Sequence, residues 1–234
     1  MKWLDLTLDL FLPDVCACCG APPARTLAVP LCPPCTDALW RFPRPLQILP
    51  GQRSAWCVGT YRGPLGRCLL RAKTRALPRE LRAVGELVAA RLHRRIPLAD
   101  AVVPVPSSRR RGVDASHLVG ERVAKRLGVP LRRLLSRVDW SGQRGQSIHA
   151  RRRKASRAYR ASASPADGRP LPRRVLLLDD VHTTGATLDA CTQELLGAGV
   201  EVVHVVAVVA SMRDLPQSSR LPQGQSSLSL PGEP

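Results

Sequence analysis

The stretch VLLLDDVHTTGATL, residues 175–188, decides the fold that we expect for this chain. Four apolar residues lead into two adjacent carboxylates, Asp179 and Asp180, and three threonines then surround a glycine. A short apolar run that ends at polar residues is typical of a buried strand, and residues 188–199 follow with a helical pattern closed by glycines. The stretch therefore predicts a strand, a tight loop and the start of a helix.

The same alternation recurs elsewhere in the chain. Apolar runs predict further strands at 54–63, 99–106 and 200–210, and helical patterns cover residues 64–95 and 114–128. Strands that alternate with helices indicate an α/β fold with a parallel sheet. Ligands bind such sheets where the carboxyl ends of strands meet the amino ends of helices. We therefore expect the functional site to lie at the quoted stretch.

The residue types in the predicted loop suit a phosphate group. Threonine hydroxyls donate hydrogen bonds, small residues let the backbone come close, and the free N–H groups at a helix start attract anions. The candidate phosphate-binding residues are Thr183, Thr184, Gly185, Ala186 and Thr187. Asp179 and Asp180 stand just before them, where two carboxylates could accept hydrogen bonds from adjacent ribose hydroxyls or help to hold Mg²⁺.

Two other interpretations of this stretch are weaker. The acids and threonines could serve only as a helix cap, but one capping residue suffices and several stand here. An apolar strand that ends in two acids also occurs in phosphoacceptor receiver domains, which need about a hundred further residues. Only 54 residues follow Asp180, so the chain is too short for that arrangement.

Five of the eight cysteines lie within residues 16–35. Cys16 and Cys19 form one Cys-x-x-Cys pair and Cys32 and Cys35 form another, which is the spacing of a tetrahedral zinc knuckle. Cys18 could replace a ligand of the first pair. Disulfides are the less favoured interpretation because the first 16 residues lack the features of a secretion signal. Four thiolates leave no open position on the metal, so we expect a structural zinc.

Charge is distributed unevenly along the chain, whose formal net charge is +18. Residues 41–160 hold 29 Lys and Arg against 6 Asp and Glu, a balance of +23, and the remainder holds 7 against 12. A basic patch favours polyanions such as nucleic acid, although runs such as residues 109–111 and 151–154 are often solvated surface only. The sequence contains no run of about 18 apolar residues, the length that spans a bilayer, and we expect a cytoplasmic protein.

The motif Asp179-Asp180-Val-His-Thr-Thr-Gly-Ala-Thr187 resembles the signature of type I phosphoribosyltransferases. Together with the four-cysteine pattern, it is similar to the ComF family, some of whose members serve in competence and DNA uptake. The likeness covers about residues 10–210. The chain departs from the family pattern at residues 113–115, which read Val-Asp-Ala in place of Phe-Asn-Gln, and at Ala76, where the family has glycine.

The resemblance implies a ligand and a role for each part of the site. Asp179 and Asp180 would contact the ribose of phosphoribosyl pyrophosphate, and the 183–187 loop would take its 5′-phosphate. Mg²⁺ would accompany this ligand. The residues expected on the pyrophosphate side are Ser107, Arg109, Arg110 and Arg111.

These observations predict a type I phosphoribosyltransferase-like parallel sheet with flanking helices and a small zinc-ribbon-like module before it. We expect the module at residues 1–45, the phosphoribosyltransferase-like domain at 50–210 and a disordered tail at 211–234. The expected function is binding of phosphoribosyl pyrophosphate and Mg²⁺, with phosphoribosyl transfer to an acceptor and a role in competence and DNA uptake. The alternative is an inactive module that binds this ligand, or one that binds single-stranded DNA through the basic face.

Overall fold

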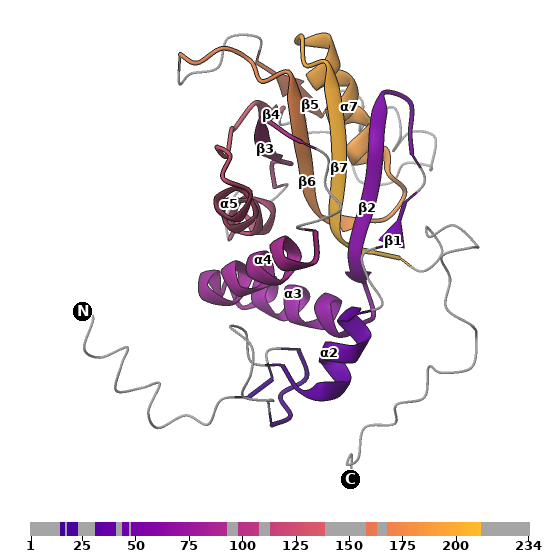
Figure 1. The fold of residues 1–234 in the computed structure, drawn as a ribbon, viewed down its shortest axis with the longest axis vertical. Helices are drawn as coiled ribbons and strands as arrows, with labels where there is room; N and C mark the ends of the chain where they lie inside the picture. Colours follow the sequence, from indigo (N-terminus) through magenta and orange to yellow (C-terminus); the bar gives the residue numbers. More distant parts are fainter. Residues whose placement is uncertain are drawn as a thin grey trace.

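The computed structural model describes residues 15–16, 18–22, 31–40, 44–46, 48–92, 98–107, 113–138, 158–162 and 168–211. Its centre is a five-stranded sheet in the order β1-β2-β7-β6-β3 (Figure 1). The strands are β1 (Arg44–Pro45), β2 (Gln52–Thr60), β3 (Ala101–Pro104), β6 (Arg174–His182) and β7 (Val202–Ala210). All neighbours pair in parallel except β1, which runs antiparallel to β2 at one edge. The predicted parallel sheet with flanking helices is confirmed.

The helices are α2 (Pro33–Trp40), α3 (Pro64–Thr74), α4 (Pro78–Leu92), α5 (Ala115–Leu127) and α7 (Ala186–Gly197). A separate antiparallel hairpin joins β4 (Leu135–Arg137) to β5 (Tyr159–Ala161). The sequence patterns predicted the long helices and the four parallel strands, and they missed β1 and this hairpin. Both are too short to show a hydrophobic period.

Two apolar clusters cover the two faces of the sheet, because successive side chains of a strand point to opposite faces. Leu176 and Leu178 of β6 pack in the cluster that includes residues of α3, α4 and α5. Val175 and Leu177 pack in the other cluster, with residues of α7 and of the β4–β5 hairpin. Every one of these four β6 side chains is almost fully buried, which explains the continuous apolar run in the sequence.

The strands β3 and β6 are neighbours whose helices lie on opposite faces of the sheet. The chain leaves β3 for α5 on one face and leaves β6 for α7 on the other. Such a reversal opens a crevice at the carboxyl ends of the two strands, and ligands of open α/β sheets bind there. The fold therefore places the 183–187 loop and the segment after β3 at one potential binding site.

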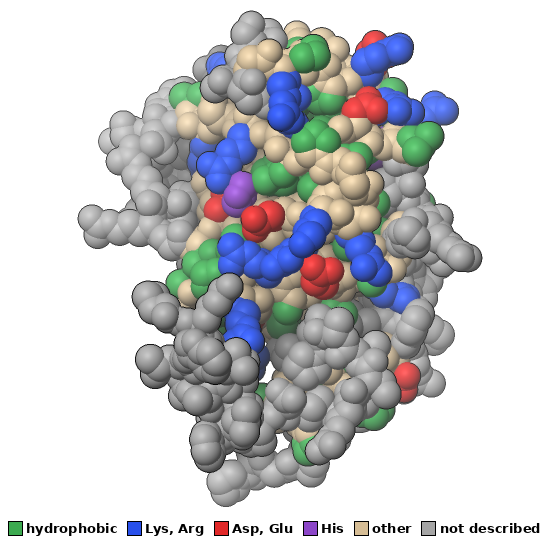
Figure 2. Space-filling model, turned by 60° about the vertical axis from the view of Figure 1, so that its left-hand side comes forward, with side chains coloured by type: hydrophobic (Ala, Val, Ile, Leu, Met, Phe, Trp, Pro, Cys, Tyr) green, Lys and Arg blue, Asp and Glu red, His purple; other side chains and the backbone are tan. Residues whose placement is uncertain are grey.

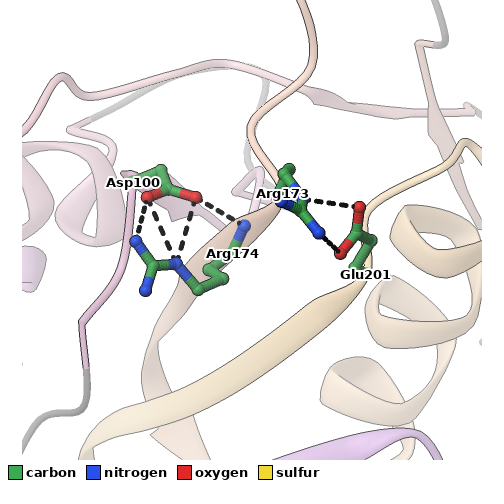
Figure 3. A network of polar contacts seen from close by, with 4 residues as sticks. All are labelled: Asp100, Arg173, Arg174 and Glu201. Carbon is green, nitrogen blue, oxygen red and sulfur yellow. Dashed lines mark hydrogen bonds and ion pairs between the residues drawn. The ribbon is translucent and has the colours of Figure 1, made fainter.

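Polar contacts fix the register of the strands at the opposite end of the sheet (Figure 3). The Arg174 backbone N–H donates to the Asp100 carboxylate at 2.9 Å, and the Arg174 guanidinium donates to the same carboxylate at 2.7 Å. Beside them, Arg173 pairs with Glu201 through two hydrogen bonds of 2.7 and 2.8 Å. Hydrogen bonds from Arg174 lower the pKa of Asp100. These contacts align the start of β6 with its neighbours, far from the crevice.

The end of α3 adopts a conformation that favours glycine but carries alanine. Ala76 has a φ of 53°, and it is the one residue other than glycine with positive φ in the described part of the chain. The Ala76 N–H donates to the Lys73 carbonyl at 3.4 Å and the Leu77 N–H to the Ala72 carbonyl at 2.9 Å. These two bonds form a Schellman motif, in which the residue at this position is usually glycine.

We predict that Ala76→Gly stabilises the protein. Left-handed backbone costs an alanine about 1–2 kcal/mol, while glycine loses more entropy on folding, so the free energy of unfolding should rise by about 0.5–1 kcal/mol. Gly128→Ala is the matched control, because Gly128 ends α5 with a φ of 69° and open space around its Cα. Urea unfolding should show a higher free energy of unfolding for Ala76→Gly and a lower one for Gly128→Ala. A lower free energy in both variants contradicts the left-handed conformation assigned to Ala76.

Candidate functional site

The loop between β6 and α7 has the geometry of an anion site. The strand β6 continues through His182, and α7 begins at Ala186 after Gly185, whose φ is 75°. No side chain caps the start of α7 within the part of the chain that the structure describes. The first amide groups of the helix therefore remain available to a ligand, and the helix dipole favours a negative charge there.

A small hollow opens at this helix start. Its lining includes four of the five predicted phosphate-binding residues and one of the two predicted carboxylates. The lining residues are Asp179, Val181, His182, Thr183, Gly185, Ala186, Thr187 and Leu188. Thr184 belongs to the same loop but does not line the hollow. His182 is an additional polar residue that the sequence did not assign to the site.

Asp179 is a buried carboxyl group, with 8% of its surface exposed. Its Oδ1 accepts hydrogen bonds from the Asp180 N–H at 2.8 Å and from the Ser116 hydroxyl at 3.5 Å. Burial raises the pKa of Asp179 to about 7, and the neighbouring Asp180 adds to the rise. At neutral pH this group is therefore divided between its acid and carboxylate forms, so it can both donate and accept hydrogen bonds.

Asp180 occupies a different environment from its neighbour. Its carboxylate forms an ion pair with the Lys73 ammonium group, which comes from the last turn of α3. Adjacent residues of a strand point to opposite faces, so Asp179 faces the α7 side and Asp180 faces the α3 side. The two acids are thus separated by the strand, and Lys73 compensates the charge of the second.

The hairpin β4–β5 contributes two residues that the sequence did not indicate. Tyr159 is 4% exposed and packs in the apolar cluster that includes Leu188 and Cys191 of α7. Burial raises the pKa of Tyr159, and the Cys191 thiol has the next largest effect. Arg137 donates from Nη1 to the Tyr159 hydroxyl at 3.4 Å. Pattern reasoning could not find these residues because their contacts with the loop join parts of the chain far apart in sequence.

The residues predicted on the pyrophosphate side are only partly described. Ser107 is half-buried and follows β3 at the carboxyl end of the sheet, and its role at the pyrophosphate stays a prediction. Arg109, Arg110 and Arg111 lie outside the described residues, so their role stays a prediction. The described segment resumes at Val113, and Asp114 caps α5 by accepting from the His117 N–H at 3.0 Å.

The four cysteines that the spacing singled out lie together. The sulfur atoms of Cys16, Cys19, Cys32 and Cys35 are all within 4.8 Å of one another. Tight turns produce this arrangement: the Gly20 N–H donates to the Cys16 carbonyl at 2.9 Å, and the Thr36 N–H donates to the Cys32 carbonyl at 3.0 Å. Tetrahedral zinc with four sulfur ligands at about 2.3 Å requires sulfur separations of this size.

Cys18 points away from this cluster. It is 5% exposed and lies outside the four-sulfur group, and its interaction with the Cys68 side chain of α3 raises the pKa of its thiol. Burial would raise the pKa of Cys16, but hydrogen bonds from the backbone of Cys32, Cys18 and Cys19 outweigh it and lower that pKa to about 6. The geometry therefore favours Cys16 and not Cys18 as the partner of Cys19 in the four-sulfur cluster.

Comparison with known proteins agrees with this geometry. Residues 112–223 match the sequence profile of the phosphoribosyl transferase domain family, a range that includes α5, β6, the 183–187 loop, α7 and β7. This part of the chain is similar to phosphoribosyl transferase domains. It is also a homologue of competence protein F from Haemophilus influenzae, with 35% identity over 124 residues, which cover 50% of this chain and 52% of the relative. The resemblance to the ComF family is thereby confirmed.

A second curated relative is named for phosphoribosyl transfer. An adenine phosphoribosyltransferase from Mycobacteroides abscessus is 38% identical over 106 residues, which cover 44% of this chain and 57% of the relative. The chain thus spans about half the length of the curated relatives it matches.

Solved phosphoribosyltransferases resemble this chain only distantly in overall shape. The glutamine phosphoribosylpyrophosphate amidotransferase of B. subtilis, complexed with ADP and GMP, is 22% identical with a TM-score of 0.39. The match covers 54% of this chain and 25% of that one. The adenine phosphoribosyltransferase of Leishmania tarentolae is 15% identical with a TM-score of 0.38, over 75% of this chain and 98% of that one.

The buried carboxyl of Asp179 makes stability depend on pH. Its pKa is about 7 in the fold against 3.8 ordinarily, so the folded state holds a proton that the unfolded chain releases between these values. The free energy of unfolding should therefore fall as pH rises from about 4 to 7. We predict that Asp179→Asn is more stable than the unaltered protein at pH 8, by up to about 4 kcal/mol.

Thermal unfolding across this pH range measures the effect. Asp180→Asn is the control, because it leaves the Lys73 ammonium group without its carboxylate and should destabilise the protein at pH 8. A stability that is independent of pH between 4 and 7, together with an Asp179→Asn variant less stable than the unaltered protein, would contradict the raised pKa.

Proposed function

We propose that this chain binds phosphoribosyl pyrophosphate together with Mg²⁺ at the crevice between β3 and β6. The observation that carries the proposal is the uncapped start of α7, which opens into the same hollow as the buried carboxyl of Asp179. The 183–187 loop would hold the 5′-phosphate through amide groups and threonine hydroxyls. Asp179, at one end of the hollow, would then face the ribose hydroxyls of the same ligand.

The two carboxylates have different tasks in this proposal. Asp179 can hydrogen-bond a ribose hydroxyl in either protonation state, since its pKa lies near 7. Asp180 is already paired with Lys73, so Mg²⁺ would be held chiefly by the phosphate groups of the ligand, with a carboxylate oxygen completing its shell. The metal would neutralise charge on the departing pyrophosphate.

We propose transfer of the phosphoribosyl group to an acceptor as the reaction of this site. Pyrophosphate leaves the anomeric carbon while positive charge develops on the sugar. A carboxylate within hydrogen-bond distance of the ribose stabilises that charge, which is the role proposed for Asp179. Ser107 and the arginines at 109–111 would face the pyrophosphate, as the resemblance to phosphoribosyltransferases implies. Homology to competence protein F supports a role for this activity in competence and DNA uptake.

The alternative function, binding of single-stranded DNA, rests on composition. The arginine-rich runs at 109–111 and 151–154 lie outside the described residues. On the face shown in Figure 2, basic and acidic side chains are interspersed, and Arg82 pairs with Glu121 at 3.3 Å between α4 and α5. Paired charges of this kind favour a solvated surface over a nucleic-acid track, so we favour the phosphoribosyl ligand. Among the described helices, none has the length and apolarity that a bilayer crossing requires.

Gly185→Ala tests the phosphate site. A Cβ at Gly185 would lie 3.0 Å from Leu49 Cδ1 and would strain a backbone with a φ of 75°, so the helix amides should lose their alignment. We expect the dissociation constant for magnesium phosphoribosyl pyrophosphate, measured by calorimetry, to rise at least about tenfold, or about 1.4 kcal/mol. Thr183→Val is a second variant that removes one hydroxyl from the hollow without backbone strain.

Gly197→Ala is the matched control for this experiment, because it adds the same methyl group at the other end of α7, where nothing lies within 4 Å. It should bind like the unaltered protein. Absence of measurable heat with the unaltered protein at millimolar ligand would refute the proposed function. Release of pyrophosphate across a panel of acceptor bases, with Asp179→Asn as the inactive reference, then distinguishes an enzyme from a binding module.

We also propose that Cys16, Cys19, Cys32 and Cys35 hold one structural zinc ion. The support is the clustering of four sulfur atoms within 4.8 Å, from two turns that each supply a pair. Elemental analysis should find about one zinc per chain, and Cys35→Ser should lower this ratio. Cys18→Ser is the control that should keep the zinc, because Cys18 faces Cys68. A folded protein that contains no zinc would overturn the assignment.

A further inference from the structure

An arginine from a distant part of the sequence stacks on a tyrosine that packs against α7. Arg137 ends β4 and pairs in register with Tyr159 of β5. Its guanidinium lies over the Tyr159 ring, 5.7 Å from the ring centre, and Nη1 donates to the Tyr159 hydroxyl at 3.4 Å. The arginine side chain is exposed, while the tyrosine beneath it is buried. The aromatic ring therefore acts as a rigid support for a solvent-facing cation.

Tyr159 connects this cation to the hollow. Its side chain packs in the same apolar cluster as Leu188 of α7, which lines the hollow, and as Cys191 of the same helix. The positive charge of Arg137 also acts on the thiol of Cys191. Thr187 and Cys191 are four residues apart on α7 and so lie on the same face of the helix. Arg137 is thus held by a tyrosine that packs on the face of α7 carrying Cys191, and the amino end of this helix faces the hollow.

The charges at the hollow leave a role for such a cation. The 183–187 loop itself contains no lysine or arginine, and Lys73 is engaged with Asp180 on the other face of the sheet. No carboxylate among the described residues forms an ion pair with Arg137. A phosphate dianion held only by amides and hydroxyls would keep much of its charge, and a guanidinium can bind two of its oxygens at once.

We propose that Arg137 is a further ligand-binding residue, which contacts the terminal phosphate held by the 183–187 loop. Tyr159 is its positioning residue, because the ring supports the guanidinium and the buried side chain packs in the same cluster as Leu188 and Cys191 of α7. This inference rests on the proposed function, since it completes the same site. It also assigns a role to the β4–β5 hairpin, which would bring a positive charge to the 183–187 loop, where no lysine or arginine stands.

Calorimetry on the full chain with ribose 5-phosphate and with magnesium phosphoribosyl pyrophosphate tests the inference. Arg137→Leu should raise the dissociation constant of both ligands at least about tenfold, because a charged hydrogen-bond donor to the phosphate is lost. Arg137→Lys should give an intermediate value, since the charge remains but the two-point geometry does not. Tyr159→Phe should cause a smaller loss of affinity, because the ring still supports the guanidinium while the hydroxyl that accepts its hydrogen bond is gone.

Arg160→Leu is the matched control. Arg160 follows Tyr159 on the same strand, carries the same charge and pairs with Glu194 at 3.2 Å, farther along α7 than the hollow. Its dissociation constants should equal those of the unaltered protein. The affinity of Arg137→Leu should also fall less steeply with added salt than that of the unaltered protein. Circular dichroism establishes whether each variant is folded. If Arg137→Leu does not fold, the affinity of Arg137→Lys tests the inference in its place.

The possible failures are distinguishable. If the unaltered protein binds both ligands and the Arg137 variants match Arg160→Leu, the inference is wrong and the phosphate loop acts without this arginine. If the unaltered protein binds neither ligand, the proposed function itself is wrong. A loss of affinity confined to the Arg137 variants and, more weakly, to Tyr159→Phe supports the assignment.

Discussion

Two carboxyl groups on adjacent residues of a buried strand are costly, because each charge loses water and repels the other. The alternation of side chains along β6 resolves this conflict. Asp179 turns to the α7 side, where it shares a hollow with the threonine loop, and Asp180 turns to the α3 side, where Lys73 neutralises it. Lys73 belongs to the last turn of α3, so this ion pair joins the end of that helix to β6.

The helices that follow β3 and β6 lie on opposite faces of the sheet, and this change of face provides the space for the site. Helices on opposite faces leave the carboxyl ends of these strands uncovered, and the uncapped start of α7 faces that space. The opposite ends of the same strands are held together by Asp100 and Arg174, so the sheet is fixed at one end and accessible at the other. Binding residues can then occupy loops without loosening the strands that carry them.

The sequence predicted the parts of the molecule that depend on local pattern. The apolar run at 175–178 predicted a buried strand, and the Thr and Gly residues at 183–187 predicted the tight loop before α7. Cysteine spacing likewise predicted the four-sulfur cluster. The pairing of Lys73 with Asp180 and the stacking of Arg137 on Tyr159 were not predictable, because each joins residues that come together only through tertiary structure. Tyr159 also lies in a strand of three residues, which is too short to show a period.

The contact between Cys18 and Cys68 bears on how this protein could be divided. Cys16, Cys18, Cys32 and Cys35 belong to the same apolar cluster as Cys68 and Leu69 of α3. The cysteine-rich segment is therefore one wall of the main core, although the sequence presents it as a separate module. A shortened protein that starts after residue 45 would expose this side of α3 to water. Because Cys68 and Lys73 belong to the same helix, a change in the cysteine turns would also affect the position of Lys73.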